Sequence, residues 1–182
     1  MSATSTEGYA RPHGKLYISV GSPCDLCESD GDQHGLIIRV NPDGSGKEIV
    51  GRGIRNTVGF DWNPQTKQLW FTEQGQDNLG TELPTDKLNR LTKVGENFGF
   101  PYCHDGNIPN PEFGGKRACS EFTGPELALG AHTSALGMTS RSRSTTRWWP
   151  CFTATIRSPE GRSNRSRIFE SWCKKWRWHW RY

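Results

Sequence analysis

The chain alternates short apolar stretches with turns rich in glycine, proline and asparagine, and this alternation limits its fold more than any other feature. The stretch ending at Val40, for example, runs directly into Asn41-Pro42-Asp43-Gly44. Proline presets φ for a turn, and an Asp-Gly pair supplies a position that tolerates positive φ. The 182 residues include 21 glycines and 11 prolines, which is a turn-rich composition. We therefore expect an all-β fold.

Strands can be placed between these turns, and no segment keeps the 3.6-residue apolar period of a helix over twelve residues. The residues 63–67 have the length and composition of a hairpin connection. The segment from Thr85 to Val94 allows a short turn of helix. The expected strands cover residues 15–20, 35–40, 47–50, 59–62 and 68–72.

Two segments resemble each other. Leu16–Gly21 and Leu69–Gly75 are both expected strands that run into a glycine-containing loop, and they lie 53 residues apart. Propeller blades repeat at about 40–50 residues with several strands in each unit. The repeat favours a β-propeller, although two copies also fit an unrelated β-sandwich.

Charge divides the chain into unequal parts. Residues 1–138 carry 12 Lys and Arg against 17 Asp and Glu, whereas residues 139–182 carry 11 against 2 and hold six of the eight tryptophans. The net charge of +4 is therefore no argument for nucleic-acid binding by the whole molecule. We expect a polar segment over 1–14, a β-rich body over 15–138 and a basic Arg/Ser/Trp-rich tail over 139–182.

Neither a membrane span nor an export signal is expected from the sequence. The longest apolar run is only a few residues, far short of the ~20 that cross a bilayer. Residues 1–14 are polar and lack the apolar centre of a signal peptide.

Two segments carry groups suited to binding chemistry. Arg55 and Asn56 stand just before an expected strand; arginine offers a planar cationic fork for carboxylate or quinone oxygens, and asparagine offers a donor and an acceptor. A loop arginine paired with a surface acid gives the same pattern. The loop over 73–80 is dense in oxygen atoms and glycine, which suits hard cations such as calcium, but it lacks the EF-hand spacing. A solvated loop is the alternative.

Cysteine and histidine leave several readings open. Cys24 and Cys27 are close, and Cys103 and Cys119 stand 16 residues apart, so we favour local disulfides formed in an oxidising compartment. A zinc site completed by His34 and His104, or free thiols, are alternatives. The candidate general bases, chosen because histidine titrates nearest neutral pH, are His13, His34, His104 and His132.

Seven ordered motifs in residues 12–138 together resemble the soluble quinoprotein glucose/sorbosone dehydrogenase family, and most closely its sorbosone-dehydrogenase-like branch. The motifs are KLYISVGSPCDLC, IIRVNPDGSG, GIRNTVGFDWNPQTKQLWFTEQGQDNLG, LPTDKLNRL, NFGFPYCH, IPNPEF and LGAHTSALGM. The resemblance implies a six-bladed β-propeller, of which this chain covers two to three blades. It also implies pyrroloquinoline quinone (PQQ) and calcium as cofactors, and a location in the periplasm or outside the cell.

The implied activity is oxidation of a sugar C1 hydroxyl, or of an aldehyde, by hydride transfer to the quinone. A non-enzymatic propeller-type binding module or an inactive fragment is the alternative. The electron acceptor is left open by the resemblance, which also gives no reason to expect a nucleic-acid partner.

The resemblance assigns roles to six residues. Arg55 and Asn56 match the pair that contacts the reacting quinone carbonyls, and the main chains of Gly75 and Gln76 match the calcium ligands. Asp86 matches an acid that helps to hold the site, and His132 matches a residue that lines the cofactor. In the exported family fold we expect two disulfides, Cys24–Cys27 and Cys103–Cys119.

The chain also departs from the family pattern. The position of the family's general-base histidine falls near Ala3, where no histidine is present. The Lys and Arg residues that grip the PQQ carboxylates come from later blades. After Met138 the composition changes as an out-of-frame reading of the same gene would change it. We therefore expect a frameshift near Met138 and a tail that is out of frame or disordered. At the start of the chain we expect an early truncation. Alternatively, the interleaved Arg and Trp of the tail bind bases or an anionic membrane surface.

Overall fold

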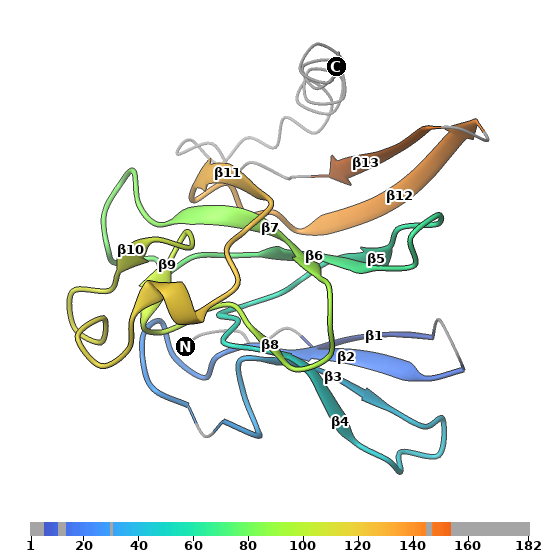
Figure 1. The fold of residues 1–182 in the computed structure, drawn as a ribbon, viewed down its shortest axis with the longest axis horizontal. Helices are drawn as coiled ribbons and strands as arrows, with labels where there is room; N and C mark the ends of the chain where they lie inside the picture. Colours follow the sequence, from blue (N-terminus) through green and yellow to red (C-terminus); the bar gives the residue numbers. More distant parts are fainter. Residues whose placement is uncertain (1–5, 11–13, 30, 145–146, 154–182) are drawn as a thin grey trace.

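The computed structural model describes residues 6–10, 14–29, 31–144 and 147–153 of the chain (Figure 1). This described part contains thirteen β-strands and one 3₁₀ helix, so the expected all-β class is confirmed. Within the same residues, none of the helical structure is long and apolar enough to cross a bilayer.

The first sheet is an antiparallel meander with one added strand. Its strand order is β1-β2-β3-β4-β8, and β8 joins β4 in parallel. The strands are β1 (Thr6–Ala10), β2 (Leu16–Val20), β3 (Leu36–Val40), β4 (Glu48–Arg52) and β8 (Glu96–Asn97).

The second sheet has four antiparallel strands in the order β11-β7-β6-β5. They are β5 (Phe60–Trp62), β6 (Leu69–Glu73), β7 (Thr85–Leu91) and β11 (Leu127–Ala131). The expected hairpin is confirmed, because residues 63–67 join β5 to β6 and Phe60 pairs with Phe71. The repeated segments supply β2 and β6. Counted along the chain, each is the second strand of its sheet, after β1 and β5 respectively.

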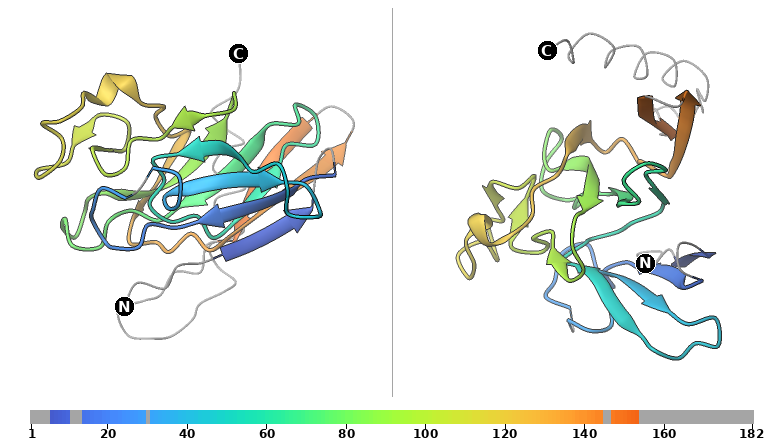
Figure 2. Two further views of the ribbon diagram at one scale, coloured as in Figure 1. Left: turned by 90° about the horizontal axis from the view of Figure 1, so that it is seen from below. Right: turned by 45° about the vertical axis from the view of Figure 1, so that its right-hand side comes forward.

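A hairpin follows the second sheet. It consists of β12 (Gly137–Ser144) and β13 (Arg147–Thr153), and it lies on the side of the second sheet that faces away from the first (Figures 1 and 2). A Cβ atom built on Gly59 would lie 2.8 Å from the Gly137 Cα, so β5 and β12 approach backbone to backbone. The five-stranded first sheet, the four-stranded second sheet and this hairpin correspond to two blades and part of a third of a β-propeller.

The hairpin crosses residue 138, where the composition changes. The expectations of an out-of-frame or disordered tail and of a truncated start concern residues that lie mostly outside the described part, namely 1–5, 145–146 and 154–182. Those expectations, and the boundaries 1–14, 15–138 and 139–182, stay predictions.

The main core lies between the two sheets. Phe71 of β6 is fully buried, and its ring packs edge-on against Phe98 with 4.9 Å between ring centroids. Tyr17 of β2 packs in the same manner against Trp62 of β5 at 4.9 Å. The buried members of this core are Tyr17, Ile37, Val50, Ile54, Phe60, Leu69, Phe71 and Phe98.

A long excursion connects β8 to β11 and carries little regular structure. It includes β9 (Cys103–His104), β10 (Ile108–Pro109) and the 3₁₀ helix η1 (Cys119–Glu121). A disulfide between Cys103 and Cys119 ties η1 to β9, and a second disulfide joins Cys24 to Cys27. Both expected disulfides are confirmed, so these four sulfurs are not available as zinc thiolates.

The expected helical turn in residues 85–94 is wrong. Residues Thr85–Leu91 form β7, which lies between β6 and β11 and pairs with both. Its polar residues permit a helix locally, but the two neighbouring strands offer partners for the backbone groups on both sides. Pairing within the sheet therefore outweighs local propensity here.

The position of the core predicts a large effect at Phe71. Replacing Phe71 with alanine should lower the free energy of unfolding by about 3–5 kcal/mol, because the cavity lies between two packed sheets. Phe71→Leu, which keeps part of the volume, should cost less. Urea unfolding of the full chain measures both changes.

The matched control is Val94→Ala, at a residue that is half exposed, which should change the same free energy by less than about 0.5 kcal/mol. Equal, small effects of Phe71→Ala and Val94→Ala would contradict a core between the sheets.

Candidate functional site

The candidate site forms where the segment before β5 meets the loop after β6. The main-chain N–H of Gln74 donates to the carbonyl of Asn56 at 2.9 Å, and the Asn56 Nδ2 donates to the Gln74 Oε1 at 2.9 Å. Two adjacent hydrogen bonds thus hold the Arg55–Asn56 pair against the oxygen-rich loop, although 18 residues separate them in sequence.

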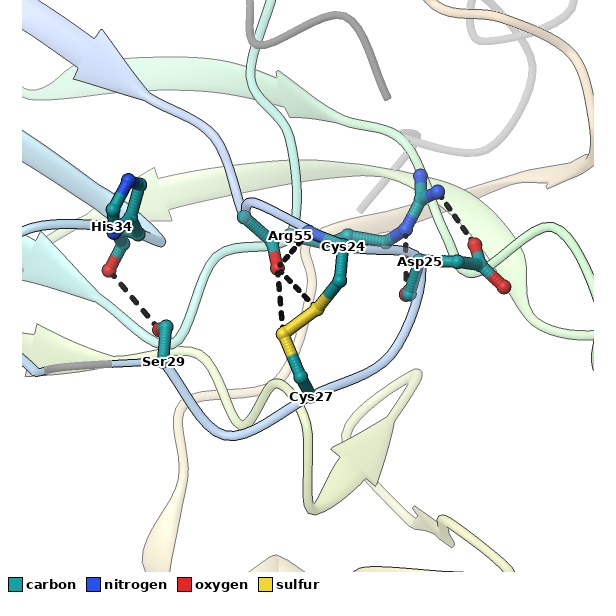
Figure 3. Close-up of a disulfide and its surroundings, with 7 residues drawn as sticks. Cys24, Asp25, Cys27, Ser29, His34 and Arg55 are labelled. Atoms are coloured by element: carbon teal, nitrogen blue, oxygen red, sulfur yellow. Dashed lines mark hydrogen bonds and ion pairs between the residues drawn. A yellow bond between two sulfur atoms is a disulfide. The ribbon is translucent and has the colours of Figure 1, made fainter. Parts of the chain in front are cut away.

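Arg55 is buried and ion-paired. Its Nη2 donates to the Asp25 Oδ1 at 2.6 Å and its Nε donates to the Asp25 carbonyl at 3.1 Å (Figure 3). The same Nη2 also donates to the Asp77 Oδ2 at 3.0 Å. A guanidinium has five N–H donors. Within the described residues the two donors on Nη1 have no partner, so that edge of the fork is available to a ligand oxygen.

Asn56 presents an unused acceptor. Its Oδ1 is buried and has no hydrogen-bond partner among the described residues. A buried polar atom without a partner is uncommon and points to a bound group that completes it. A Cβ atom on Gly21 would lie only 2.7 Å from this oxygen, so glycine is required beside it.

Side chains on other elements fix the loop that begins at Gly75. The Gly75 N–H donates to the Asp86 Oδ1 at 2.9 Å, and the Asp86 Oδ2 accepts the Thr133 hydroxyl at 3.1 Å. The Gln76 Oε1 accepts the Asn110 Nδ2 at 3.2 Å. In the described part of the chain no donor engages the main-chain carbonyls of Gly75 and Gln76. These carbonyls are the kind of oxygen that calcium binds.

His132 lies apart from the other five expected site residues. It is exposed, its φ is 54°, and its Nε2 lies 2.7 Å from the Gly80 carbonyl oxygen. Its neighbour Thr133 reaches Asp86, so the same loop contacts the site one residue further along. His132 therefore contacts the far end of the 73–80 loop at Gly80, and no hydrogen bond among the described residues joins it to the other five expected site residues.

A buried carboxylate lies directly beneath this network and was not expected from the sequence. The Glu73 side chain is 1% exposed; its Oε1 accepts the Arg55 N–H at 2.9 Å, and its Oε2 accepts the Asn89 Nδ2 at 2.6 Å. The Lys87 Nζ lies 3.6 Å from the same Oε2. Glu73 and Lys87 are directly opposed across β6 and β7, a cross-strand charge pair that the helical expectation for this segment concealed.

His104, one of the candidate general bases named from the sequence, is a second buried polar residue close to this network. It is 1% exposed, and its Nε2 lies 2.9 Å from the Asn110 Nδ2 that also bonds to Gln76. Because the amide nitrogen donates, Nε2 accepts. Burial, together with the positive charge of Lys87, lowers the pKa of His104 to about 4, so the ring is neutral at pH 7.

Asp25 remains ionised beside Arg55. Partial burial raises the pKa of this carboxyl, but the Asp77 N–H, the Arg55 charge and the Asn78 amide together lower the pKa below its usual value. With Asp77 also at Arg55, the two carboxylates outweigh one guanidinium, and the region beside the loop carries net negative charge.

Among the described residues, no group of three or more His, Cys, Asp or Glu side chains is arranged to hold a metal ion. A cation site here would therefore be built mainly from main-chain oxygens. The free carbonyls of Gly75 and Gln76, beside net negative charge, fit calcium in donor type, since calcium takes oxygen ligands.

Comparison with known proteins gives one family. The family model described as glucose/sorbosone dehydrogenase matches residues 9–149. An uncharacterized protein of Borreliella burgdorferi is 34% identical over 127 residues, which cover 69% of this chain and 33% of that protein. The chain thus spans about a third of the length of this curated relative.

Two solved structures show the same fold over most of the chain. The holo form of the PQQ domain of pyranose dehydrogenase from Coprinopsis cinerea is 15% identical, with a TM-score of 0.65 over 90% of this chain and 55% of that one. The calcium structure of a family AA12 carbohydrate-active enzyme from Trichoderma reesei is 17% identical, with a TM-score of 0.61 over 91% and 56%.

The neutral, buried state of His104 predicts a loss of stability in acid. Its pKa is about 4 in the fold and ~6.5 when unfolded, so the unfolded chain binds more protons between these values and stability falls as the pH drops from 6.5 to 4. His104→Gln, which does not titrate, should remove about 2 kcal/mol of the loss between pH 7 and pH 4.5.

Urea unfolding at both pH values, on both proteins, measures this difference. An identical loss of stability in the two proteins would show that His104 is protonated as readily in the fold as in the unfolded chain.

Proposed function

Because the chain belongs to the glucose/sorbosone dehydrogenase family, we propose that it carries one face of the cofactor site of a PQQ-dependent sugar dehydrogenase. The substrate class that we propose is a sugar oxidised at its C1 hydroxyl, or an aldehyde. The chain covers only part of its relatives, so the remaining face of such a site belongs to segments that correspond to later blades.

One observation carries this proposal: unused polar groups gather on the two segments that the hydrogen bonds bring together. They are the Nη1 of Arg55, the buried Oδ1 of Asn56 and the main-chain carbonyls of Gly75 and Gln76. A cation donor, an acceptor and oxygen ligands are the groups needed to hold a charged quinone together with calcium.

In this proposal each residue has a separate task. The carbonyls of Gly75 and Gln76 would hold calcium, and Asp86 fixes the position of Gly75 through its N–H. The Arg55 Nη1 would donate to an oxygen of the cofactor, and the Asn56 Oδ1 would accept a hydrogen bond from an N–H or O–H of the bound group. His132 lines the cofactor from the neighbouring loop.

The bound quinone supplies the hydride acceptor, which no protein side chain can provide. The chain's own contribution is electrostatic and positional. The free N–H groups on the Arg55 Nη1 would donate to an oxygen on which negative charge develops, and they need no reorientation because Asp25 and Asp77 already hold the guanidinium. Only 6% of Arg55 is exposed.

The proposed location is the periplasm or the outside of the cell. Two local disulfides support it, because such bonds persist in oxidising compartments and are rare in the reducing cytosol.

Cofactor binding tests the proposal. The full chain with calcium should bind PQQ and shift the quinone absorbance, and Arg55→Ala should weaken PQQ binding by about 10–100-fold, as expected for a lost hydrogen bond to a charged group. Arg55→Lys, which keeps the charge and loses the fork, should fall between the two.

The matched control is Arg39→Ala, which removes the same charge from the exposed pair with Glu48 on the first sheet. It should leave PQQ affinity within about threefold of the parent, since exposed pairs contribute little. No calcium-dependent change in quinone absorbance with the parent chain would reject the proposed site.

Turnover is a separate expectation. With PQQ and calcium present, dye-coupled oxidation of glucose or of a sorbosone-type aldehyde should be weak, because a general base contributes ~10²–10⁴-fold and no histidine stands near Ala3. That position lies outside the described residues.

Rapid turnover that Arg55→Ala abolishes would show that another group acts as the base. A chain that binds no quinone in the presence of calcium would instead favour the binding-module alternative.

A further inference from the structure

Asp25 collects hydrogen bonds from both halves of the candidate site. Its Oδ1 accepts the Arg55 Nη2 at 2.6 Å and the Asp77 N–H at 2.7 Å. Its Oδ2 accepts the Asn78 N–H at 3.3 Å and the Asn78 Nδ2 at 3.0 Å. Its main-chain carbonyl accepts the Arg55 Nε at 3.1 Å. One residue thus orients the guanidinium and anchors residues 77 and 78 of the loop that carries Gly75 and Gln76.

These contacts join equivalent loops of the two sheets. Asp25 lies in the loop after β2, and Asp77 and Asn78 lie in the loop after β6, the strand that occupies the same place in the second sheet. The partners are 52 and 53 residues apart in sequence. The main-chain N–H groups of residues 77 and 78 both have Asp25 as their acceptor, so the position of this part of the loop depends on the Asp25 side chain.

The Cys24–Cys27 disulfide encloses Asp25. The two half-cystines flank it at a separation of three residues, and the Ser22 hydroxyl lies 3.5 Å from the Cys24 sulfur and 4.0 Å from the Cys27 sulfur (Figure 3). Ser22 is itself anchored, because its N–H donates to the Arg55 carbonyl at 2.6 Å. The disulfide closes residues 24–27 into a short covalent ring, and Ser22, two residues before it, is bonded to the Arg55 backbone. The Asp25 main chain therefore has few alternative conformations.

We propose that Asp25 is a positioning residue of the cofactor site, and that the Cys24–Cys27 disulfide keeps it in place. The effect of Asp25 on cofactor binding rests on the proposed function. The structural dependence of the loop on Asp25 and on the disulfide does not. Asp25 acts through Arg55 and through the 75–78 backbone, so breaking the disulfide weakens the site although no charge is lost.

Asp77 provides a matched comparison. It also pairs with Arg55, at 3.0 Å, but its side chain is 68% exposed. Asp77→Asn removes the same charge at Arg55 as Asp25→Asn does, yet it leaves both main-chain N–H groups on Asp25. A difference between these variants therefore reports positioning and not charge.

Amide hydrogen exchange on the full chain tests the linkage without any cofactor. The double variant Cys24→Ser, Cys27→Ser and the variant Asp25→Ala should each raise the exchange rates of the amides of residues 77 and 78 by about tenfold or more. Asp77→Asn should leave the Asn78 rate within about threefold of the parent. The amides of Phe71 and Leu88 in the second sheet should be unchanged, which excludes general loss of the fold.

Calcium titration by calorimetry, with the metal alone, tests the consequence for the site. Asp25→Asn and the double cysteine variant should each weaken calcium binding by about tenfold, and Asp77→Asn by less than about threefold. Unchanged exchange at residues 77 and 78 in both Asp25→Ala and the double cysteine variant would overturn the linkage.

The outcomes separate the two proposals. Equal calcium affinity of the parent and the double cysteine variant would overturn the positioning role while leaving the calcium site intact. A parent chain that binds no calcium would reject the proposed function, and the exchange rates would still decide whether the disulfide and Asp25 hold the loop.

Discussion

The buried carboxylate of Glu73 links the core to the candidate site. It lies at the end of β6, with Lys87 and Asn89 of β7 on one side and the backbone N–H of Arg55 on the other. A charge removed from water is tolerated only when hydrogen bonds and an opposite charge compensate it, so each of these partners must stay in place. The same hydrogen bonds that keep Glu73 compensated therefore fix where Arg55 enters the site.

The polar residues around the site fall into two sets. Glu73, Lys87, Asn89 and His104 are almost fully buried, and their hydrogen bonds and ion pair involve residues within the fold. Arg55, Asn56, Gly75 and Gln76 each keep a polar group unused. The first set holds the backbone and side chains in place, so the unpaired donors and acceptors of the second set cannot turn to satisfy one another.

The strands that alternate with glycine and proline turns were predictable, since short apolar runs and turn residues act locally. The 53-residue repeat also placed β2 and β6 in equivalent positions. The helical expectation for 85–94 failed because the residues of β7 are polar, and their burial follows from pairing with two strands that are distant in sequence. Asp25 was missed for a similar reason: its partners lie more than fifty residues away, and nothing near it in sequence marks it as an acceptor. Arg55 and Asn56 were found by their motif, and their roles stay predictions.

The contact between Gly59 and Gly137 has a consequence for the unit that follows the second sheet. At that point β5 and β12 meet through main-chain atoms, which every residue possesses. Such a junction depends on the extended shape of the backbone and not on the side chains further along the hairpin. Sequence change in the later part of the hairpin is therefore compatible with its attachment, whereas a single methyl group added at Gly59 would push the strands apart.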